Sequence, residues 1–390
     1  MHLDADMDWI EEALAALKDK GLWRQLRTTG SPPGPEIAID GRRVVQFASN
    51  DYLSLASDPR LADAAARAAR EGGSGATASR LIVGTHGRVA ELERRLAGLK
   101  HTEDALVLPT GYMANLALVT SLVGRGDAVF VDRLCHASIL DAARLSRARV
   151  VTFRHNDPVR LDERLRVKTG YSRRLVVTES VFSMYGDLAP LGELVGVARA
   201  HGAMFVVDEA HATGVFGPGG AGLAEQQGVG PGEITATVGT LSKALAGLGG
   251  FVTASRQVVD LMVNTARPFI FTTGIPPAQA AVALAALDVV RDEPERRARL
   301  LESASRLRER LRGLGLDVGA SGSQIVPVVL GSAARAVAVS ERLWDRGFYV
   351  PAIRPPSVPR GASRLRISLQ YGHTEDQISR LVEALGAACA

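Results

Sequence analysis

The sequence predicts an α/β fold in which a large domain with a mostly parallel sheet is followed by a smaller α+β domain. Short apolar, β-rich runs alternate with Ala- and Leu-rich helical stretches, and these are often long enough for crossover helices. This alternation is typical of βαβ units whose sheet is covered on both faces, and ligands of such sheets bind beyond the carboxyl ends of the strands. The runs occupy residues 104–108, 128–131, 150–153, 175–178, 204–207, 235–238 and 250–253.

The segments around this region predict a division into domains 1–43, 44–277 and 278–390. Ile10, Leu14 and Leu17 fall at helical spacing, so residues 8–27 predict an amphipathic helix that SPPGP at 31–35 ends. We expect this helical arm to dock on the body. In the C-terminal part, the sequence predicts a helix at 278–291 and a second helix that follows it and ends near 314. Further helices are predicted at 334–346 and from 375. The β-rich runs of this part are 325–330, FYVPAI and LRISL.

Length and composition favour a two-lobed enzyme with a small ligand. The chain has 390 residues and a net charge of only +4, and its arginines are scattered rather than clustered with aromatic residues, so we expect no nucleic-acid partner. The apolar runs are too short or too interrupted to span a bilayer, and the N-terminus lacks an apolar signal-peptide core. Cys135 and Cys389 suit a reducing compartment, and their spacing suggests no metal site. We expect a cytoplasmic protein.

Two strand ends carry the strongest candidates for catalysis. In FVVDEAHATG, Asp208 ends an apolar run and His211 follows; a carboxylate there could hold a proton on a pyridine nitrogen, and the alternative is a helix-capping Asp beside a surface His. In TVGTLSKALAGLGG, Lys243 follows another run, close to the hydroxyl of Thr240. A confined lysine can be neutral enough to form a Schiff base, and the alternative is a solvated lysine in a flexible loop.

Three further strand ends carry weaker signals. The Gly111–Tyr112 pair stands at a strand–turn–helix junction whose free N–H groups suit a phosphate, or it is an ordinary turn. His136 in RLCHASI could cover the face of a flat cofactor, or it is a packed histidine. Ser183 in TESVFSMYGD is a contact for a ligand or a capping serine.

Two glycine-rich segments each allow more than one interpretation. GPGGAG at 217–222 matches a dinucleotide-binding pattern, but it does not directly follow a strand, so a mobile loop is the better interpretation and a nicotinamide dehydrogenase is disfavoured. GGSGATASR at 72–80 lies between helical stretches inside a domain, which favours a functional loop over a linker.

Over nearly its whole length the chain resembles the α-oxoamine synthases, a family of fold-type I enzymes that depend on pyridoxal 5′-phosphate (PLP). Members condense an amino acid with an acyl thioester and release carbon dioxide, and the resemblance implies a homodimer with shared active sites. The RPPSVP segment favours members that use L-alanine and a pimeloyl thioester, because glycine-using members usually carry Tyr-Pro where this chain has Arg354-Pro355. The motifs are SNDYLSL, GGSGATASRLIVGTH, PTGYMANLA, DRLCHASILDA, VFSMYGDLAPL, VVDEAHATGVFG, TLSKALAGLGG, RPFIFTTGIPPA and RPPSVPRGASRLRISL.

The resemblance implies a role for each residue at the cofactor. Lys243 matches the Schiff-base lysine and Asp208 the partner of the pyridine nitrogen. His136 is expected to stack on the ring, His211 to approach its ring oxygen, and Ser183 to contact its polar edge. A catalytically silent partner subunit of the same fold is the alternative, and the intact Lys243, Asp208 and His136 argue against it.

The resemblance also implies the contacts to phosphate and substrate. Thr240 and the amides of Gly111 and Tyr112 match phosphate-binding positions, and Thr273 matches one that reaches the phosphate of the neighbouring subunit. Arg354 matches the residue that pairs with the carboxylate of the amino acid.

Three positions depart from the family pattern. Ala212 replaces a glycine in DEAHATG, where its methyl group could narrow the site, and Ser54 replaces a glycine in NDYLSL. Trp23 stands where some members have an arginine suited to the acyl substrate, and Arg24 or Arg27 could substitute for it.

Overall fold

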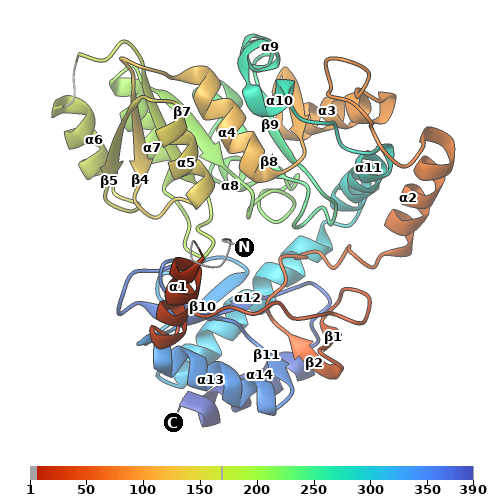
Figure 1. Cartoon of the computed structure of the whole chain (residues 1–390), viewed down its shortest axis with the longest axis vertical. Coiled ribbons are helices and arrows are strands. Elements are labelled where there is room, and N and C mark those ends of the chain that lie inside the picture. The colour runs from red at the N-terminus through yellow and green to blue at the C-terminus, as the bar shows by residue number, and fades with distance from the viewer. Residues whose placement is uncertain (1–6, 168–169, 390) are drawn as a thin grey trace.

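The computed structural model describes residues 7–167 and 170–389, and these form two lobes joined by a long helical connection (Figure 1). The large lobe is built on a seven-stranded sheet, and the small lobe contains two three-stranded sheets. The predicted α/β fold class is therefore confirmed.

All seven predicted runs form the large sheet, in the spatial order β3-β9-β8-β7-β6-β4-β5. Strand β9 is antiparallel to both of its neighbours, and the other pairs are parallel, so the sheet is mostly parallel as predicted. Every residue of β4, β8 and β9 is buried, which explains why these runs are continuously apolar or small rather than alternating. The strands are β3 Asp104–Leu108, β4 Ala128–Asp132, β5 Arg149–Phe153, β6 Arg174–Glu179, β7 Met204–Asp208, β8 Ala236–Thr240 and β9 Gly250–Ala254.

Helices cover this sheet in groups. Helix α4 packs against β8, β9 and α5, whereas α7 packs against β7 and α6, and α11 packs against α2 and α3. The helices of this lobe are α2 Pro59–Gly72, α3 Gly87–Lys100, α4 Gly111–Leu122, α5 Ala137–Leu145, α6 Pro158–Val167, α7 Leu191–Ala200, α8 Leu223–Gln226, α9 Arg256–Thr265, α10 Arg267–Ile270 and α11 Pro277–Asp292, with a short 3₁₀ helix at Pro231–Glu233.

The small lobe combines both ends of the chain. One sheet has the order β1-β2-β11 and the other β10-β13-β12, so strands near residue 40 pair with a strand near residue 348. The division at residues 43 and 277 stays a prediction. In the structure, β2 pairs with both β1 and β11 in the small lobe, and α11 packs in the large lobe. The elements are β1 Glu36–Ile39, β2 Arg42–Gln46, α12 Glu295–Gly313, β10 Ile325–Gly331, α13 Ala333–Asp345, β11 Phe348–Tyr349, β12 Ala352–Ile353, β13 Ser363–Ser368 and α14 Glu375–Cys389.

The β1–β2 hairpin was not predicted, although its turn carries a clear signal. Asp40 and Gly41 connect the strands with φ of 50° and 80°, the left-handed conformation that a two-residue hairpin turn requires. An Asp-Gly pair flanked by IAI and VV is the sequence pattern typical of this turn. The interpretation of residues 1–43 as a helical arm was therefore wrong for residues 36–43.

The N-terminal helix is shorter than predicted. Helix α1 spans Asp8–Asp19, and Gly21, at a φ of 63°, lies just beyond its end, so the prediction of a helix to residue 27 was wrong. No residue of α1 is buried, and Trp9 is 66% exposed. The arm touches the small lobe where Arg354 donates a hydrogen bond to the Gly21 carbonyl. Its apolar face stays exposed in the single chain, contrary to the expected docking.

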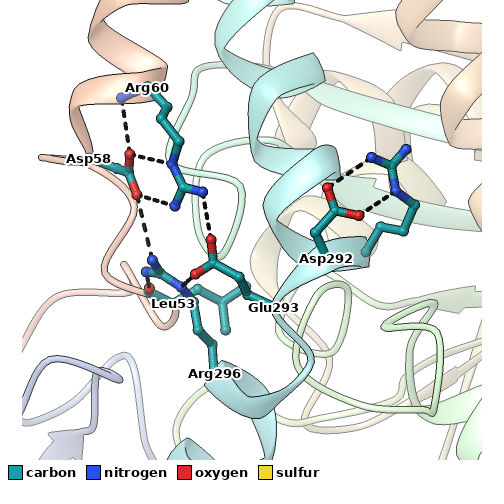
Figure 2. A network of polar contacts seen from close by, with 7 residues as sticks. Leu53, Asp58, Arg60, Asp292, Glu293 and Arg296 are labelled. Carbon is teal, nitrogen blue, oxygen red and sulfur yellow. Dashed lines mark hydrogen bonds and ion pairs between the residues drawn. The ribbon is translucent and has the colours of Figure 1, made fainter.

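Charged side chains fasten the two lobes at the break between α11 and α12 (Figure 2). Asp58 caps α2 and pairs with Arg60, which also reaches Glu293 at 2.5 Å. Arg296 of α12 pairs with Glu293 and donates a hydrogen bond to the Leu53 carbonyl at 3.0 Å. The segment before α2 is thereby held at the junction of the lobes, next to the site described below.

Candidate active site

One cavity lies where the parallel strands β4, β6, β7 and β8 end, and its volume is about 430 Å³. The position is the one expected for a ligand of a doubly wound sheet. Of the predicted cofactor-binding residues, all but Thr273 line it. The wall consists of Ala48, Asn50, Gly111, Tyr112, Asn115, His136, Ser138, Glu179, Ser183, Met184, Asp208, Ala210, His211, Val238, Gly239, Thr240, Lys243, Pro351, Ile353 and Arg366.

Lys243 follows β8 and turns its amine into this cavity, where Nζ lies 2.8 Å from His211 Nε2. Burial disfavours the ammonium form and lowers the pKa of Lys243 to about 8, although Asp208 and Glu179 oppose the shift. A lysine with this pKa is partly neutral near pH 7 and can act as a nucleophile. The alternative of a solvated lysine in a flexible loop is wrong.

Asp208 is the last residue of β7 and is buried at the cavity wall. Its carboxylate accepts hydrogen bonds from Asn115 Nδ2 and from the Ala210 amide, both at 2.8 Å. Asn115 Oδ1, also buried, has no hydrogen-bond partner within the described part of the chain. The two hydrogen bonds from Asn115 and Ala210 thus fix the orientation of the Asp208 carboxylate.

His211 is buried behind Lys243, which contradicts the alternative of a surface histidine. Burial lowers the pKa of His211 well below its usual range, and the positive charge of Lys243 adds to this effect, so the imidazole is neutral. Tyr52 lies 2.6 Å from His211 Nδ1 and donates its hydroxyl proton to Asn50 Oδ1 at 3.1 Å. The two ring nitrogens of His211 therefore contact Tyr52 on one side and Lys243 on the other.

Arg366 brings a guanidinium group to the cavity from β13 in the small lobe. It is 5% exposed, and it donates to the Ser183 carbonyl at 2.6 Å and to Asn50 Oδ1 at 3.0 Å. Sequence reasoning assigned no role to Arg366, Tyr52 or Asn50. All three stand in segments that resemble the family, SNDYLSL and SRLRISL, which was the available signal.

His136 stands at the N-cap of α5, with its ring facing the cavity. Its amide donates to Glu179 Oε1 at 2.6 Å, and its Nδ1 lies 2.8 Å from Ser138 Oγ. Burial lowers the pKa of His136, although the Asp208 carboxylate opposes the shift. Burial and the nearby Asp208 charge raise the pKa of Glu179 to about 8. The wall thus presents a neutral imidazole at neutral pH.

Helix α4 begins at the cavity and offers an anion site. Thr110 caps the Met113 amide, so the amides of Gly111 and Tyr112 remain beyond the helix's own hydrogen bonds. Thr240 lies beside them, because a Cβ on Gly111 would be 3.6 Å from Thr240 Oγ1. Gly250 permits this approach, since a Cβ there would lie 2.5 Å from Gly111 Cα.

These residues fit PLP. The partly neutral amine of Lys243 can bond to an aldehyde, the Asp208 carboxylate can hold a proton on a ring nitrogen, and the start of α4 with Thr240 can hold a phosphate. The unpartnered Asn115 Oδ1 leaves an acceptor beside Asp208. Among the described residues, no group of three or more His, Cys, Asp or Glu side chains is placed to hold a metal ion.

Three predicted site residues lie away from this wall. Thr273 is exposed and forms an isolated β-bridge with Ser79. The glycine-rich loop at 72–80 therefore contacts the segment that carries Thr273. Arg354 follows Ile353, which lines the cavity, but its own side chain bonds to Gly21. Arg24 is exposed on the arm.

The departures from the family pattern find physical explanations. Ser54 adopts a φ of 54°, the left-handed conformation that a glycine takes without strain. Ala212 is fully buried in the core, and the cavity wall at this turn comes from Ala210 and His211. Arg27 pairs with Asp40 at 3.4 Å and lies over the Trp344 ring.

The GPGGAG loop binds its own chain. Amides of Gly219 and Ala221 donate to the Glu225 carboxylate at 3.0 and 2.9 Å. A Cβ on Gly222 would lie 2.1 Å from Glu209 Oε2, so close packing accounts for this glycine. Because these amides already hold a carboxylate, the nicotinamide interpretation loses its support.

Comparison with known proteins agrees with the fold. The family model for aminotransferase class I and II matches residues 42–385. The 8-amino-7-oxononanoate synthase of Anaeromyxobacter dehalogenans (strain 2CP-1 / ATCC BAA-258) is 49% identical, over 98% of this chain and 95% of that protein. The solved structure of Sphingomonas wittichii serine palmitoyltransferase has a TM-score of 0.92 and 35% identity, covering 100% of this chain and 98% of that one.

A structure described as SPT with PLP internal aldimine has a TM-score of 0.92 at 36% identity and covers the same shares of the two chains. The site and these matches define the class of protein. The chain belongs to the aminotransferase class I and II family, and the fold and family resemblance predicted from the sequence are confirmed.

Proposed function

We propose that this chain is an 8-amino-7-oxononanoate synthase, a PLP-dependent acyltransferase of biotin biosynthesis. It joins L-alanine to a pimeloyl thioester, delivered by CoA or a carrier protein, and carbon dioxide is lost. The observation that carries this proposal is the buried Lys243 amine facing Asp208 and Arg366 across one cavity. The relative that is 49% identical and named for this reaction supports the choice within the family.

Different residues of the cavity wall have different roles toward PLP. When bound, PLP supplies a protonated ring that accepts the electron pair left at the amino acid's Cα. Asp208 holds the proton on the ring nitrogen, and Asn115 and the Ala210 amide hold Asp208. His136 would cover the ring face, while Gly111, Tyr112 and Thr240 would bind the phosphate.

Lys243 acts twice. Its amine would hold the aldehyde of the cofactor, and the same amine, once free, would remove the Cα proton of alanine. Its pKa of about 8 suits a base at neutral pH, since a positioned base works best with a pKa near the operating pH. His211 would contact the cofactor's ring oxygen, and Ser183 its polar edge.

The site is completed by a second copy of the chain. Thr273 is exposed beside Leu81, Ile82 and Val83, which are 49%, 75% and 75% exposed. An apolar surface of this kind favours burial against a partner. We place Thr273 at the partner's phosphate and Arg24 of the arm at the acyl substrate, in a cytoplasmic homodimer. Among the described residues, no helix is long and apolar enough to cross a membrane.

A glycine-using synthase, such as 2-amino-3-ketobutyrate CoA ligase, is the alternative. Purified protein with PLP should be offered L-alanine, glycine or L-serine against pimeloyl, acetyl and palmitoyl thioesters, and the products weighed by mass spectrometry. We expect the product of L-alanine and the pimeloyl thioester to dominate. A dominant glycine or serine product overturns the proposed substrate and keeps the reaction class.

Arg354 is proposed to hold the alanine carboxylate, because RPPSVP places it next to the cavity-lining Ile353. Truncating one partner of a buried charge pair costs about 2–5 kcal/mol, so Arg354→Ala should raise the apparent alanine constant by about thirtyfold or more. Arg354→Lys should recover only part of this loss, because the two-pronged guanidinium is missing. The thioester constant should change much less.

The variant Arg366→Ala, measured in parallel, shows whether Arg354 or Arg366 binds the alanine carboxylate. Steady-state kinetics beside a melting curve for each variant show which arginine acts on alanine. If Arg354→Ala changes the melting temperature alone, while Arg366→Ala raises the alanine constant, the carboxylate belongs to Arg366.

The capture of PLP by the cofactor-free protein should depend on pH. Only the neutral amine attacks an aldehyde, so the capture rate should rise as pH increases through about 8, rather than near the ordinary lysine value of 10.5. Stopped-flow absorbance measures this rate. A midpoint near 10.5 would show that Lys243 is not desolvated.

A further inference from the structure

His155 lies outside the cavity, between the two segments that carry part of its wall. It follows β5, and its two ring nitrogens face two different carboxylates. Nδ1 lies 3.0 Å from Asp132 Oδ1, and Nε2 lies 2.5 Å from Asp187 Oδ2. A ring that donates from both nitrogens is an imidazolium. His155 therefore makes two charged hydrogen bonds to chain segments that are distant in sequence.

Asp132 is joined to the segment that ends in His136. It is the last residue of β4 and has a fully buried side chain. Its carboxylate accepts from the Leu134 amide at 2.9 Å and the Asn156 amide at 2.8 Å. The turn from β4 to α5, which presents the His136 ring, is therefore built on the carboxylate that His155 holds.

Asp187 closes the turn that carries Ser183 and Met184, both in the cavity wall. The Phe182 amide donates to the Asp187 carbonyl at 3.1 Å, and the edge of the His155 ring packs on the Phe182 ring with centroids 4.3 Å apart. The Asp187 side chain is 11% exposed and that of His155 is 15% exposed. The contact is therefore largely shielded from water, where charged hydrogen bonds are strongest.

The small lobe holds the same turn from its other side. Arg366 donates to the Ser183 carbonyl at 2.6 Å, and Arg364 donates to the Met184 carbonyl at 3.4 Å. Without His155, the turn would keep its attachment to β13 and lose its charged hydrogen bond to the segment after β5. Asn156 Nδ2 would still donate to Asp187 Oδ2 and to the Leu188 carbonyl, both at 3.1 Å. The distance between His136 and Ser183 across the cavity would then be held less tightly.

We propose that His155 is a positioning residue for the reaction: it ties Asp132 to Asp187 and so sets the spacing of His136 and the Ser183–Met184 turn across the cavity. This proposal rests on the proposed function, because its consequence is the placement of the bound cofactor and the amino acid. His155 itself touches neither.

The electrostatic surroundings agree with a ring that is charged at neutral pH. Burial, the largest single effect, lowers the pKa of His155, but Asp132 and Asp187 together outweigh it and raise the pKa to about 9. The titratable and charged groups facing the ring from the packed elements are Asp132 of β4, Asp187 and Tyr185 of the turn, and Arg364 of β13 behind the Tyr185 ring, with Arg154 and Asp157 on its own segment.

The test compares His155→Gln with the parent by hydrogen exchange, cofactor circular dichroism and kinetics. Amides in 132–136 and 182–187 should exchange about fivefold faster or more in the variant, and the visible circular dichroism of bound PLP should weaken. The turnover number should fall about tenfold with little change in the alanine constant, since small misplacements act on the rate.

His201→Gln is the matched control, because His201 also pairs with a carboxylate, Asp162 at 2.7 Å, but bridges α6 and the end of α7. It should leave both segments and the cofactor signal unchanged. If His155→Gln does not fold, Asp187→Asn removes the charge of one of the two carboxylates that face His155 and should give the same changes. Normal exchange, dichroism and turnover in a folded variant of either kind overturn the proposal.

The exchange and dichroism measurements need no turnover, so they judge the role of His155 even if the parent protein makes no 8-amino-7-oxononanoate. They also respond to pH in the parent. Because the folded pKa of about 9 lies above the ordinary 6.5, the stabilisation is fully present below pH 6.5 and is lost as pH rises through about 9. Melting temperatures should show this loss in the parent and not in His155→Gln.

Discussion

Replacing Lys243 by alanine should abolish turnover and leave the fold intact. Alanine can neither bond to the cofactor nor remove the Cα proton of the substrate, and losing a positioned base alone costs about 10²–10⁴-fold in rate. The loss of both functions places the expected decrease beyond the upper end of that range. Because His211 is the one hydrogen-bond partner of the Lys243 amine among the described residues, removing the amine should cost little stability.

Peptide mapping after borohydride reduction checks the assignment in the parent protein. The reduced cofactor should be found on Lys243. Lys100 serves as the internal control, because it is also buried but is paired with Glu209 at 2.6 Å. A label on Lys100, or a fully active Lys243→Ala protein, would end the assignment of Lys243.

Changing Asp208 to asparagine should reduce activity far more than cofactor occupancy. A neutral amide no longer stabilises the proton on the ring nitrogen, and removing one such electrostatic contact typically costs about 10²–10³-fold in rate. The phosphate contacts at Gly111, Tyr112 and Thr240 remain, so PLP should still bind. Absorbance of bound PLP and steady-state kinetics, measured on the same sample, separate the two effects.

Asp162→Asn is a suitable control, since Asp162 lies on α6, outside the cavity wall, and pairs there with Arg166 and His201. It should keep parental turnover. An Asp208→Asn protein with near-parental turnover would remove Asp208 from its proposed role.

The strands of the large sheet could be predicted because burial on both faces makes them continuous apolar runs. Strand β4 illustrates this: AVFV is followed by Asp132, and the polar residue marks the strand end where the site lies. Lys243 and Asp208 were found for the same reason, as polar residues at strand ends. Periodicity was less reliable for α1, because the apolar spacing continues past Gly21, where the backbone leaves the helix.

The contacts that complete the site could not be predicted from local pattern. Tyr52 meets His211 across 159 residues, and Asn50 meets Arg366 across 316, so only the packing of the two lobes brings them together. His155 and Asp187 likewise belong to different strand–helix units. Thr273 and Arg354 remain predictions, because their proposed roles involve a partner subunit and a bound substrate.

The most direct measurement follows the carbon atoms of the reaction. The protein with PLP is incubated with L-alanine labelled in its carboxyl carbon and a pimeloyl thioester, and the gas and the amine product are quantified by mass spectrometry. We expect one labelled carbon dioxide for each 8-amino-7-oxononanoate, no label in the product, and none of either from Lys243→Ala. Label retained in the product, or carbon dioxide released without carbon–carbon bond formation, would contradict a decarboxylative acyl transfer by this chain.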